Sequence, residues 1–108
     1  MKEITIEFIL QFLKTSKFAY SPTHKKLSYP VLLRIYNKLK GGERFRPIHI
    51  YNNIIVDGHH RYVCLNILNR EIEILNWTLS SSSVITSWDK IEIENIDWDH
   101  PTKHTLLI

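Results

Sequence analysis

Cysteine is almost absent from the chain, which has one among its 108 residues. One thiol forms no intramolecular disulfide, and the sequence contains no Cys-x-x-Cys pair and no His-Glu-x-x-His string, so no metal site of the structural zinc type is predicted. A signal-peptide pattern and an uninterrupted apolar run of membrane length are both missing. We therefore expect a cytoplasmic protein that does not enter a membrane.

Two familiar catalytic patterns are also missing. The sequence has no Gly-x-x-x-x-Gly-Lys-Ser/Thr loop and no Ser-His-Asp signature, so neither P-loop nor serine-hydrolase chemistry is proposed. What is present is enough apolar material for a core, since 44% of the residues are hydrophobic. A chain of 108 residues suits one compact domain and is short for two, so we expect a single domain over residues 1–108.

Charge is divided unevenly along the chain. Residues 1–70 contain 12 Lys and Arg against 4 Asp and Glu, whereas residues 71–108 contain 2 against 7. A basic part of net +8 favours a polyanionic ligand, and an acidic part of net −5 would shield that surface or face a basic partner. The alternative is that both parts are ordinary solvated faces.

Two helices are predicted in the first 40 residues. Apolar residues recur at helical spacing over residues 5–14, and an exposed loop is expected over residues 20–26. A second apolar stripe begins after Ser28, a suitable N-cap, and ends before Gly41. The outer face of this second helix would carry basic side chains, namely Arg34, Lys38 and Lys40.

The middle of the chain predicts a hairpin, a helix and a further strand. Residues 47–51 and 54–56 flank two asparagines, which tolerate the positive φ of a tight turn. A helix follows Gly58, and residues 71–75 alternate as another strand. A strand, a helix and a strand in this order predict a crossover unit that pairs its flanking strands in parallel.

Beyond Trp77 the pattern is less regular. Four serines, residues 80–83, suit an exposed loop, and residues 84–88 suit a short helix or strand. Residues 90–94 alternate as a strand for a sheet edge, and residues 97–108 are expected to be irregular.

The turn from strand to helix at residues 57–61 is the candidate functional site. A strand that passes through glycine into a helix places unpaired backbone N–H groups and the positive end of the helix dipole at one point. Such a point binds anions, most often phosphate, and the first turn here adds His59, His60 and Arg61 as hydrogen-bond donors. We expect phosphate to bind at Gly58, His59, His60 and Arg61.

Each of these side chains has a structural alternative. Asp57 either orients the site or a metal as a catalytic group, or caps the helix. His60 either moves a proton or donates to phosphate, or it is bonded to the backbone; His59 is expected to be the more exposed and auxiliary of the two. Arg61 is either the phosphate anchor or part of an ion pair. Cys64, one turn after His60, is either a metal ligand with it or a small buried apolar residue.

The residues around this turn resemble the core of the ParB/sulfiredoxin superfamily. The resemblance lies in the strand Pro47–Ile50, in the string Val56–Tyr62 and in the strand Glu71–Ile74, and it spans about residues 28–75. It implies an α+β fold with a small mixed sheet packed with helices, followed by an acidic C-terminal extension over residues 76–108. It also implies that Gly58–Arg61 holds the phosphates of a nucleotide or nucleic acid, as in ParB-like proteins that include small-molecule kinases.

Departures from the superfamily's patterns narrow the function. His59 stands where sulfiredoxins have a reactive cysteine, so repair of oxidised peroxiredoxin is not expected. The residues after 75 are too few and too acidic for the DNA-reading domain of partition proteins, so chromosome partitioning is not expected either. The string Gly42–Arg46 looks like the ParB arginine box but precedes the first strand, so we treat that as coincidence. Arg46 remains a candidate phosphate ligand, with Arg44 beside it.

Two functions from different classes remain. One is a nucleotide- or nucleic-acid-binding enzyme, a nuclease or phosphotransferase, in which His60 and Asp57 are catalytic and Mg²⁺ accompanies the nucleotide. The other is a non-catalytic module of the same fold that binds a basic protein, as an immunity or antitoxin-type protein does. In the second function Trp88 and Trp98, beside carboxylates, would form the interface.

Overall fold

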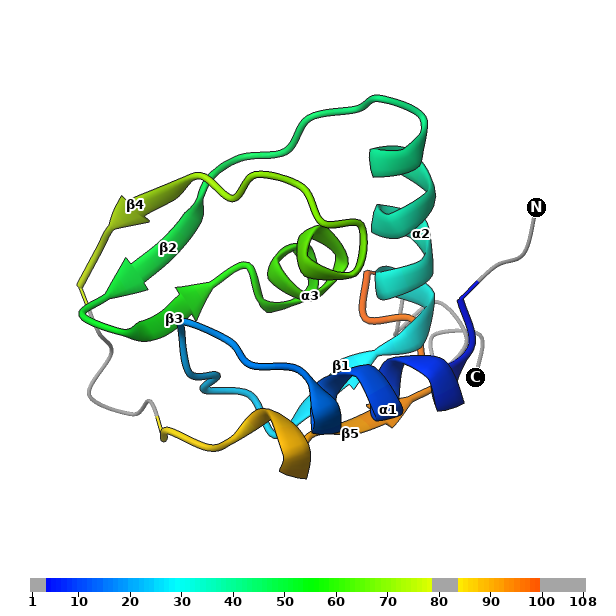
Figure 1. The fold of residues 1–108 in the computed structure, drawn as a ribbon, viewed down its shortest axis with the longest axis horizontal. Helices are drawn as coiled ribbons and strands as arrows, with labels where there is room; N and C mark the ends of the chain where they lie inside the picture. The colour runs from blue at the N-terminus through cyan, green and yellow to red at the C-terminus, as the bar shows by residue number, and fades with distance from the viewer. Residues whose placement is uncertain (1–3, 79–83, 100–108) are drawn as a thin grey trace, which may run out of the picture.

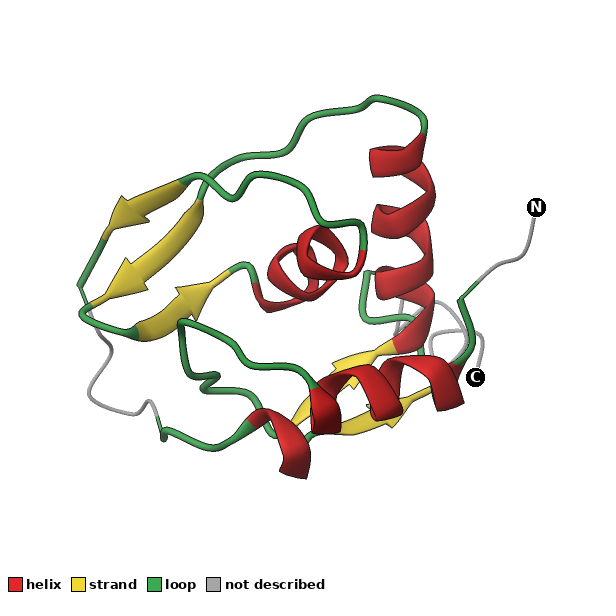
Figure 2. Cartoon of the chain, in the orientation of Figure 1, coloured by secondary structure: helices red, strands yellow, loops and turns green. Residues whose placement is uncertain are grey.

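The fold consists of three α-helices and two small β-sheets in the part of the chain that the structure describes (Figures 1 and 2). This computed structural model describes residues 4–78 and 84–99, so the serines at 80–83 and residues 100–108 lie outside the described ranges. The elements in chain order are α1 (Ile6–Thr15), β1 (Lys26–Ser28), α2 (Tyr29–Lys40), β2 (Ile48–Tyr51), β3 (Ile54–Asp57), α3 (His59–Ile67), β4 (Ile74–Asn76), the 3-10 helix η1 (Trp88–Lys90) and β5 (Glu92–Glu94).

Both predicted N-terminal helices are confirmed, and Ser28 caps the second as expected. The side chain of Thr5 accepts a hydrogen bond from the Phe8 backbone N–H at 3.0 Å at the start of α1. The hydroxyl of Ser28 does the same for α2, accepting from Val31 at 3.3 Å. Helix α2 ends at Lys40 with Gly41 as its C-cap, and the following Gly42 has a φ of 96°, which glycine adopts without strain.

The larger sheet has the strand order β3-β2-β4. Strands β2 and β3 form the predicted antiparallel hairpin, and Asn52 in its turn has a positive φ of 54°. The predicted parallel pairing of the two strands that flank α3 is wrong, because β4 pairs in parallel with β2 at the other edge. The hairpin reverses the chain, so β3 is antiparallel to β2. The chain returns through α3 to form β4 parallel to β2, which leaves β4 antiparallel to β3.

The smaller sheet joins two segments that are far apart in the sequence. Strands β1 and β5 pair in parallel, with Lys26 opposite Glu92 and Ser28 opposite Glu94. The expected strand over residues 90–94 is therefore present at a sheet edge, as β5. The expected loop over residues 20–26 passes at its last residue into β1, a strand that was not predicted.

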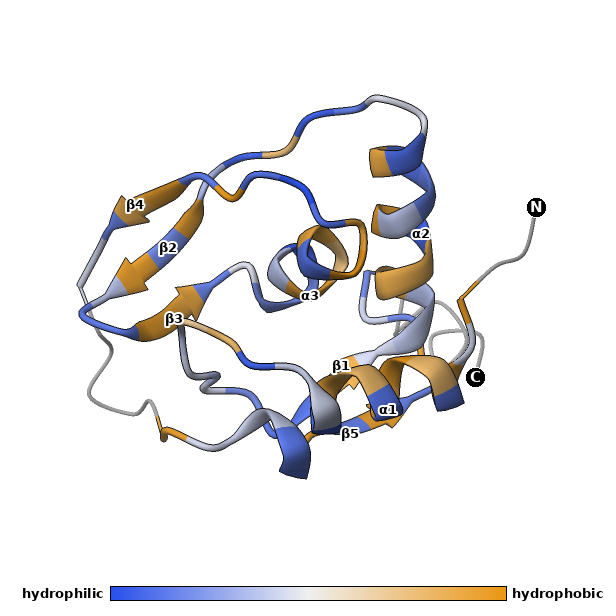
Figure 3. Ribbon diagram, viewed as in Figure 1, coloured by the Kyte–Doolittle hydropathy of each residue, from blue (hydrophilic) through white to orange (hydrophobic). Residues whose placement is uncertain are grey.

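Helix α3 lies between α2 and the larger sheet and carries the candidate site at its first turn (Figure 1). Apolar residues of the helices and strands, drawn orange in Figure 3, supply the core around it. Trp88 is 7% exposed, and its ring nitrogen donates to the Tyr20 carbonyl at 2.7 Å, so its predicted place at an interface is wrong. Within the described residues, no helix is both long enough and apolar enough to cross a membrane. Fully buried core residues include Ile9, Leu27, Leu32, Ile48, Ile55 and Val63.

Candidate functional site

Gly58 forms the turn that starts α3. Its φ of 103° and ψ of 26° are left-handed, and it occupies the N-cap position without any side-chain hydrogen bond to the helix. The predicted capping role of Asp57 is therefore wrong, since Asp57 is the last residue of β3 and lies one position too early. A β-carbon at Gly58 would lie 2.6 Å from Nη2 of Arg61 and 2.9 Å from Cδ1 of Ile48, so the turn requires glycine.

Arg61 lies directly over this turn. Its side chain is 12% exposed, and its Nη2 is 3.5 Å from both Oδ2 of Asp57 and the carbonyl oxygen of Pro47. Its Nε is buried without a hydrogen-bond partner among the described residues. Arg61 therefore forms the ion pair that was one of its two predicted roles, and in this arrangement the guanidinium stabilises the turn from within.

His60 is bonded to the backbone of another element. Its Nε2 accepts a hydrogen bond from the Ser28 N–H at 2.9 Å, and its ring meets Trp98 edge-on with centroids 5.1 Å apart. Burial, together with the nearby His24 and Arg61, lowers the pKa of His60 to about 4. At neutral pH the ring is uncharged and its Nε2 lone pair is occupied, so the geometry matches the backbone-bonded alternative rather than the proton carrier.

His59 is buried, and the prediction that it is the more exposed histidine is wrong. It is 1% exposed, its Nε2 accepts from the Thr23 N–H at 2.8 Å, and its ring stacks on His24 with centroids 3.9 Å apart. Burial and the neighbouring imidazoles lower its pKa to about 3. The segment before β1 covers this histidine, which is why a position in the first turn of a helix does not face solvent.

A cavity of about 440 Å³ opens beside the first turn of α3. Gly58, His59, His60 and Arg61 form one wall, so the predicted site residues do lie together. We call this space the basic cavity, because five cationic side chains but only two acidic ones line it in the described structure. The cationic residues are Arg34, Lys38, Arg44, Arg46 and Arg61, and the acidic residues are Asp57 and Asp99.

The cationic side chains of the basic cavity come from α2, from the loop before β2 and from α3, and they differ in exposure and in ion pairing. Arg34 and Lys38 lie on α2, and Arg46 follows from the loop before β2 with an exposed side chain. Arg44, on the same loop, is 84% exposed and is 3.4 Å from Glu73, which is a weak surface pair. Arg34 and Lys38 were predicted on the outer face of a helix, and no local pattern connects them with the turn at Gly58.

No metal site is assembled in the described residues. They contain no group of three or more His, Cys, Asp or Glu side chains that would hold an ion. Cys64 is fully buried with its Sγ 3.2 Å from the Leu32 carbonyl oxygen, and burial raises its pKa to about 12. It matches the small buried apolar residue and not the metal ligand. Asp57, the candidate carboxylate for Mg²⁺, is largely exposed but contacts Arg61 and, at 3.9 Å, His49.

The arrangement as a whole suits the binding of an anion. The first-turn N–H groups of α3 have no acceptors within the helix, and the surrounding side chains carry excess positive charge. The two histidines contribute by fixing the turn and not by carrying charge. Comparison of the chain with protein-family models, with curated proteins and with solved structures gave no match.

Proposed function

We propose that the basic cavity binds the phosphate groups of a nucleotide or nucleic acid. The observation that carries this proposal is the meeting of five cationic side chains with the N-terminal turn of α3 around one cavity. Helix amides and guanidinium groups both donate to phosphate oxygens, and they do so from fixed directions. A volume of about 440 Å³ also lies within the range of small-molecule sites.

The resemblance of residues 28–75 to the ParB/sulfiredoxin superfamily agrees with this proposal. In that superfamily a strand enters a glycine-containing turn, and the helix after it holds phosphate. Here the corresponding turn runs from Gly58 to Arg61 after β3. The ParB/sulfiredoxin-like fold is accordingly part of the proposal, beyond the α+β architecture already described.

Binding is better supported than bond cleavage. A nuclease or phosphotransferase needs a group that moves a proton near neutral pH. The Nε2 of His60 accepts the Ser28 N–H, and the pKa of His60 is lowered to about 4. Asp57 contacts Arg61 and so serves the turn. The proposal therefore assigns phosphate binding to Arg46, Arg61 and the α3 amides, with His59 and His60 as positioning residues.

Titration with phosphate ligands tests this function. We expect ADP or a short single-stranded oligonucleotide of thymidine to bind at low salt, and to bind more weakly as salt increases. The variant Arg46→Ala removes an exposed cavity cation and leaves the Gly58 turn intact, so it should weaken binding at least ten-fold, or about 1.4 kcal/mol.

Lys90→Ala is the matched control. Lys90 is an exposed cation in η1 that does not line the basic cavity, so its loss changes the net charge equally. It should change the affinity less than two-fold if the cavity is the site. Absence of binding to every ligand at low salt, or equal losses in both variants, would contradict the proposal.

A second candidate function rests on a different surface. Tyr51 of β2, Leu75 of β4 and Trp77 just after β4 are exposed although they are large and apolar, and the strand register places them on one face of the larger sheet. Such side chains on neighbouring strands are typical of a protein-binding surface, which favours the non-catalytic module. Copurification from the native source distinguishes the two functions: one stoichiometric basic protein, lost in Leu75→Asp, supports the module, and bound nucleotide supports the cavity.

A further inference from the structure

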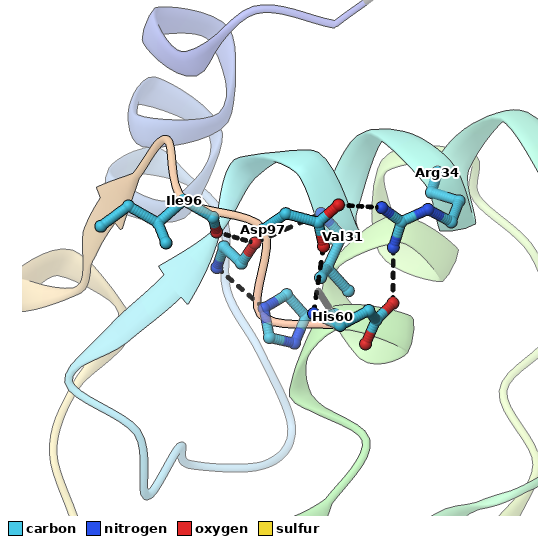
Figure 4. A network of polar contacts seen from close by, with 7 residues as sticks. Val31, Arg34, His60, Ile96 and Asp97 are labelled. Atoms are coloured by element: carbon cyan, nitrogen blue, oxygen red, sulfur yellow. Dashed lines mark hydrogen bonds and ion pairs between the residues drawn. The ribbon is translucent and has the colours of Figure 1, made fainter. Parts of the chain in front are cut away.

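Arg34 holds two carboxylates of residues 94–99, which we call the acidic segment. Its Nη2 lies 2.5 Å from Oδ2 of Asp97, and its Nη1 lies 2.5 Å from Oδ2 of Asp99 (Figure 4). Arg34 is 31% exposed, and both Arg34 and Asp99 line the basic cavity. The segment thus places anionic groups on one of the cations that surround the proposed phosphate site.

The acidic segment is positioned by contacts near its two carboxylates. The Ser28 hydroxyl donates to the Ile96 carbonyl at 2.6 Å, and the Trp98 ring nitrogen donates to Glu94 at 2.6 Å. The backbone N–H of Asp99 donates to Oδ1 of Asp97 at 3.0 Å, and both carboxylates of this segment reach Arg34. Figure 4 shows Asp97 and Arg34 pointing toward each other from this segment and from α2.

The contact resembles an occupied ligand site. A guanidinium binds two carboxylate oxygens with the same planar pair of donors that it uses for a phosphate. Three of the remaining cavity cations differ, because Lys38, Arg44 and Arg46 are exposed and, of these three, only Arg44 has an acidic contact that the structure records, the weak one to Glu73; the fourth, Arg61, is held by Asp57. The cavity therefore has a basic part that is open and a basic part, at Arg34, that is filled from within.

We propose that the basic cavity takes a ligand with at least two phosphate groups, one of which replaces Asp97 and Asp99 on Arg34. This inference rests on the proposed function. A first phosphate would bind at the α3 turn and the open cations, and a second would compete for the guanidinium of Arg34. Competition is feasible because the contact is open to solvent at Asp99, whose side chain is 55% exposed, and because a terminal phosphate brings roughly two negative charges on one group.

The two phosphate groups could belong to a nucleoside diphosphate or to consecutive nucleotides of a nucleic-acid strand. The experiment measures ADP, a thymidine oligonucleotide and inorganic phosphate against the wild type and against Asp97→Asn/Asp99→Asn. We expect the double variant to bind ADP or the oligonucleotide at least five-fold more tightly, and inorganic phosphate less than two-fold more tightly. The ligand with the larger gain identifies the source.

The matched control is Asp89→Asn/Glu92→Gln, which makes the same change in net charge outside the basic cavity. Equal gains in both double variants, or no gain for Asp97→Asn/Asp99→Asn, would overturn the inference. Arg34→Gln gives an independent measurement, because it removes the guanidinium and should weaken ADP or oligonucleotide binding at least five-fold. An unchanged affinity in Arg34→Gln would also overturn it.

These outcomes separate the inference from the proposed function. If Arg46→Ala loses affinity while the changes at Arg34, Asp97 and Asp99 have no effect, the phosphate site stands and the two-phosphate ligand fails. If the wild type and the Asp97→Asn/Asp99→Asn variant bind none of the three ligands, both fail. Circular dichroism of each variant checks that the fold is retained.

Discussion

The Nε2 atom of His60 lies 2.9 Å from the backbone nitrogen of Ser28 and accepts its hydrogen bond. The hydroxyl of the same serine caps α2 by accepting from Val31. One residue thereby ties the first turn of α3 to the first turn of α2, the two helices whose side chains line the basic cavity. An acceptor at this position must be uncharged, because a protonated imidazole donates from both nitrogens.

Stability should therefore decrease as the pH falls below about 6.5. His59 and His60 have pKa values near 3 and 4 in the folded chain, so the unfolded chain binds protons first. Their contribution is complete above 6.5 and is lost as the pH falls, down to about 4 for His60 and about 3 for His59, by up to about 1.4 kcal/mol per histidine for each pH unit. Urea unfolding at several pH values measures this loss.

His60→Gln is the control for that dependence. The amide oxygen of glutamine can accept the Ser28 N–H without titrating, so the slope between pH 6.5 and 4 should become smaller and leave the contributions of His59 and His24, whose pKa burial also lowers. An unchanged slope in this variant would assign the pH dependence to other groups.

Gly58→Ala should destabilise the protein by about 2–3 kcal/mol. The alanine would have to adopt a left-handed φ of 103°, and its β-carbon would crowd Arg61 and Ile48. Gly42→Ala has a similar φ of 96° but meets no atom within 4 Å, so it should cost only about 1 kcal/mol. The difference between the two free energies of unfolding isolates the crowding. Equal costs would show that Arg61 moves away freely.

Trp88→Phe should lower the free energy of unfolding by about 2 kcal/mol, because it leaves the Tyr20 carbonyl unpaired and opens space in the core. Trp77→Phe, at a position that is 51% exposed, should cost less than about 1 kcal/mol. Chemical unfolding of both variants makes the comparison. A larger loss of stability in Trp77→Phe than in Trp88→Phe would contradict the structural role assigned to Trp88.

Cys64 should react with a thiol reagent only through unfolding. Its thiol is fully buried and its pKa is raised to about 12 by burial, so thiolate is scarce in the folded state. The reaction rate in buffer should be at least about 100-fold slower than in denaturant. A fast reaction in buffer would show that the contact of Cys64 with the Leu32 carbonyl opens readily.

Local patterns predicted most of the elements correctly. The helices at residues 5–14 and after Ser28, the hairpin and the helix after Gly58 all depend on neighbours within a few positions. Residues that lie together in the string from Asp57 to Arg61 necessarily lie together at the cavity, with Arg46 joining them.

The errors concern contacts between distant segments. The directions of His59 and His60 depend on Thr23 and Ser28, which lie 36 and 32 positions away in the sequence. The pairing of β4 with β2 was missed because the hairpin reverses the chain before α3. Similarly, nothing near Arg34 indicates that Asp97 will lie against it.

The parallel pairing of β1 with β5 has a consequence for synthesis. The two strands lie 66 positions apart, so a growing polypeptide on the ribosome carries Arg34 and the first turn of α3 well before Glu92 is added. During that interval the guanidinium is uncovered, and pairing must wait for a slow, entropically costly closure of the chain. If the proposed function holds, a nascent copy would meet polyanions with Arg34 uncovered, whereas the finished molecule would first have to displace Asp97 and Asp99.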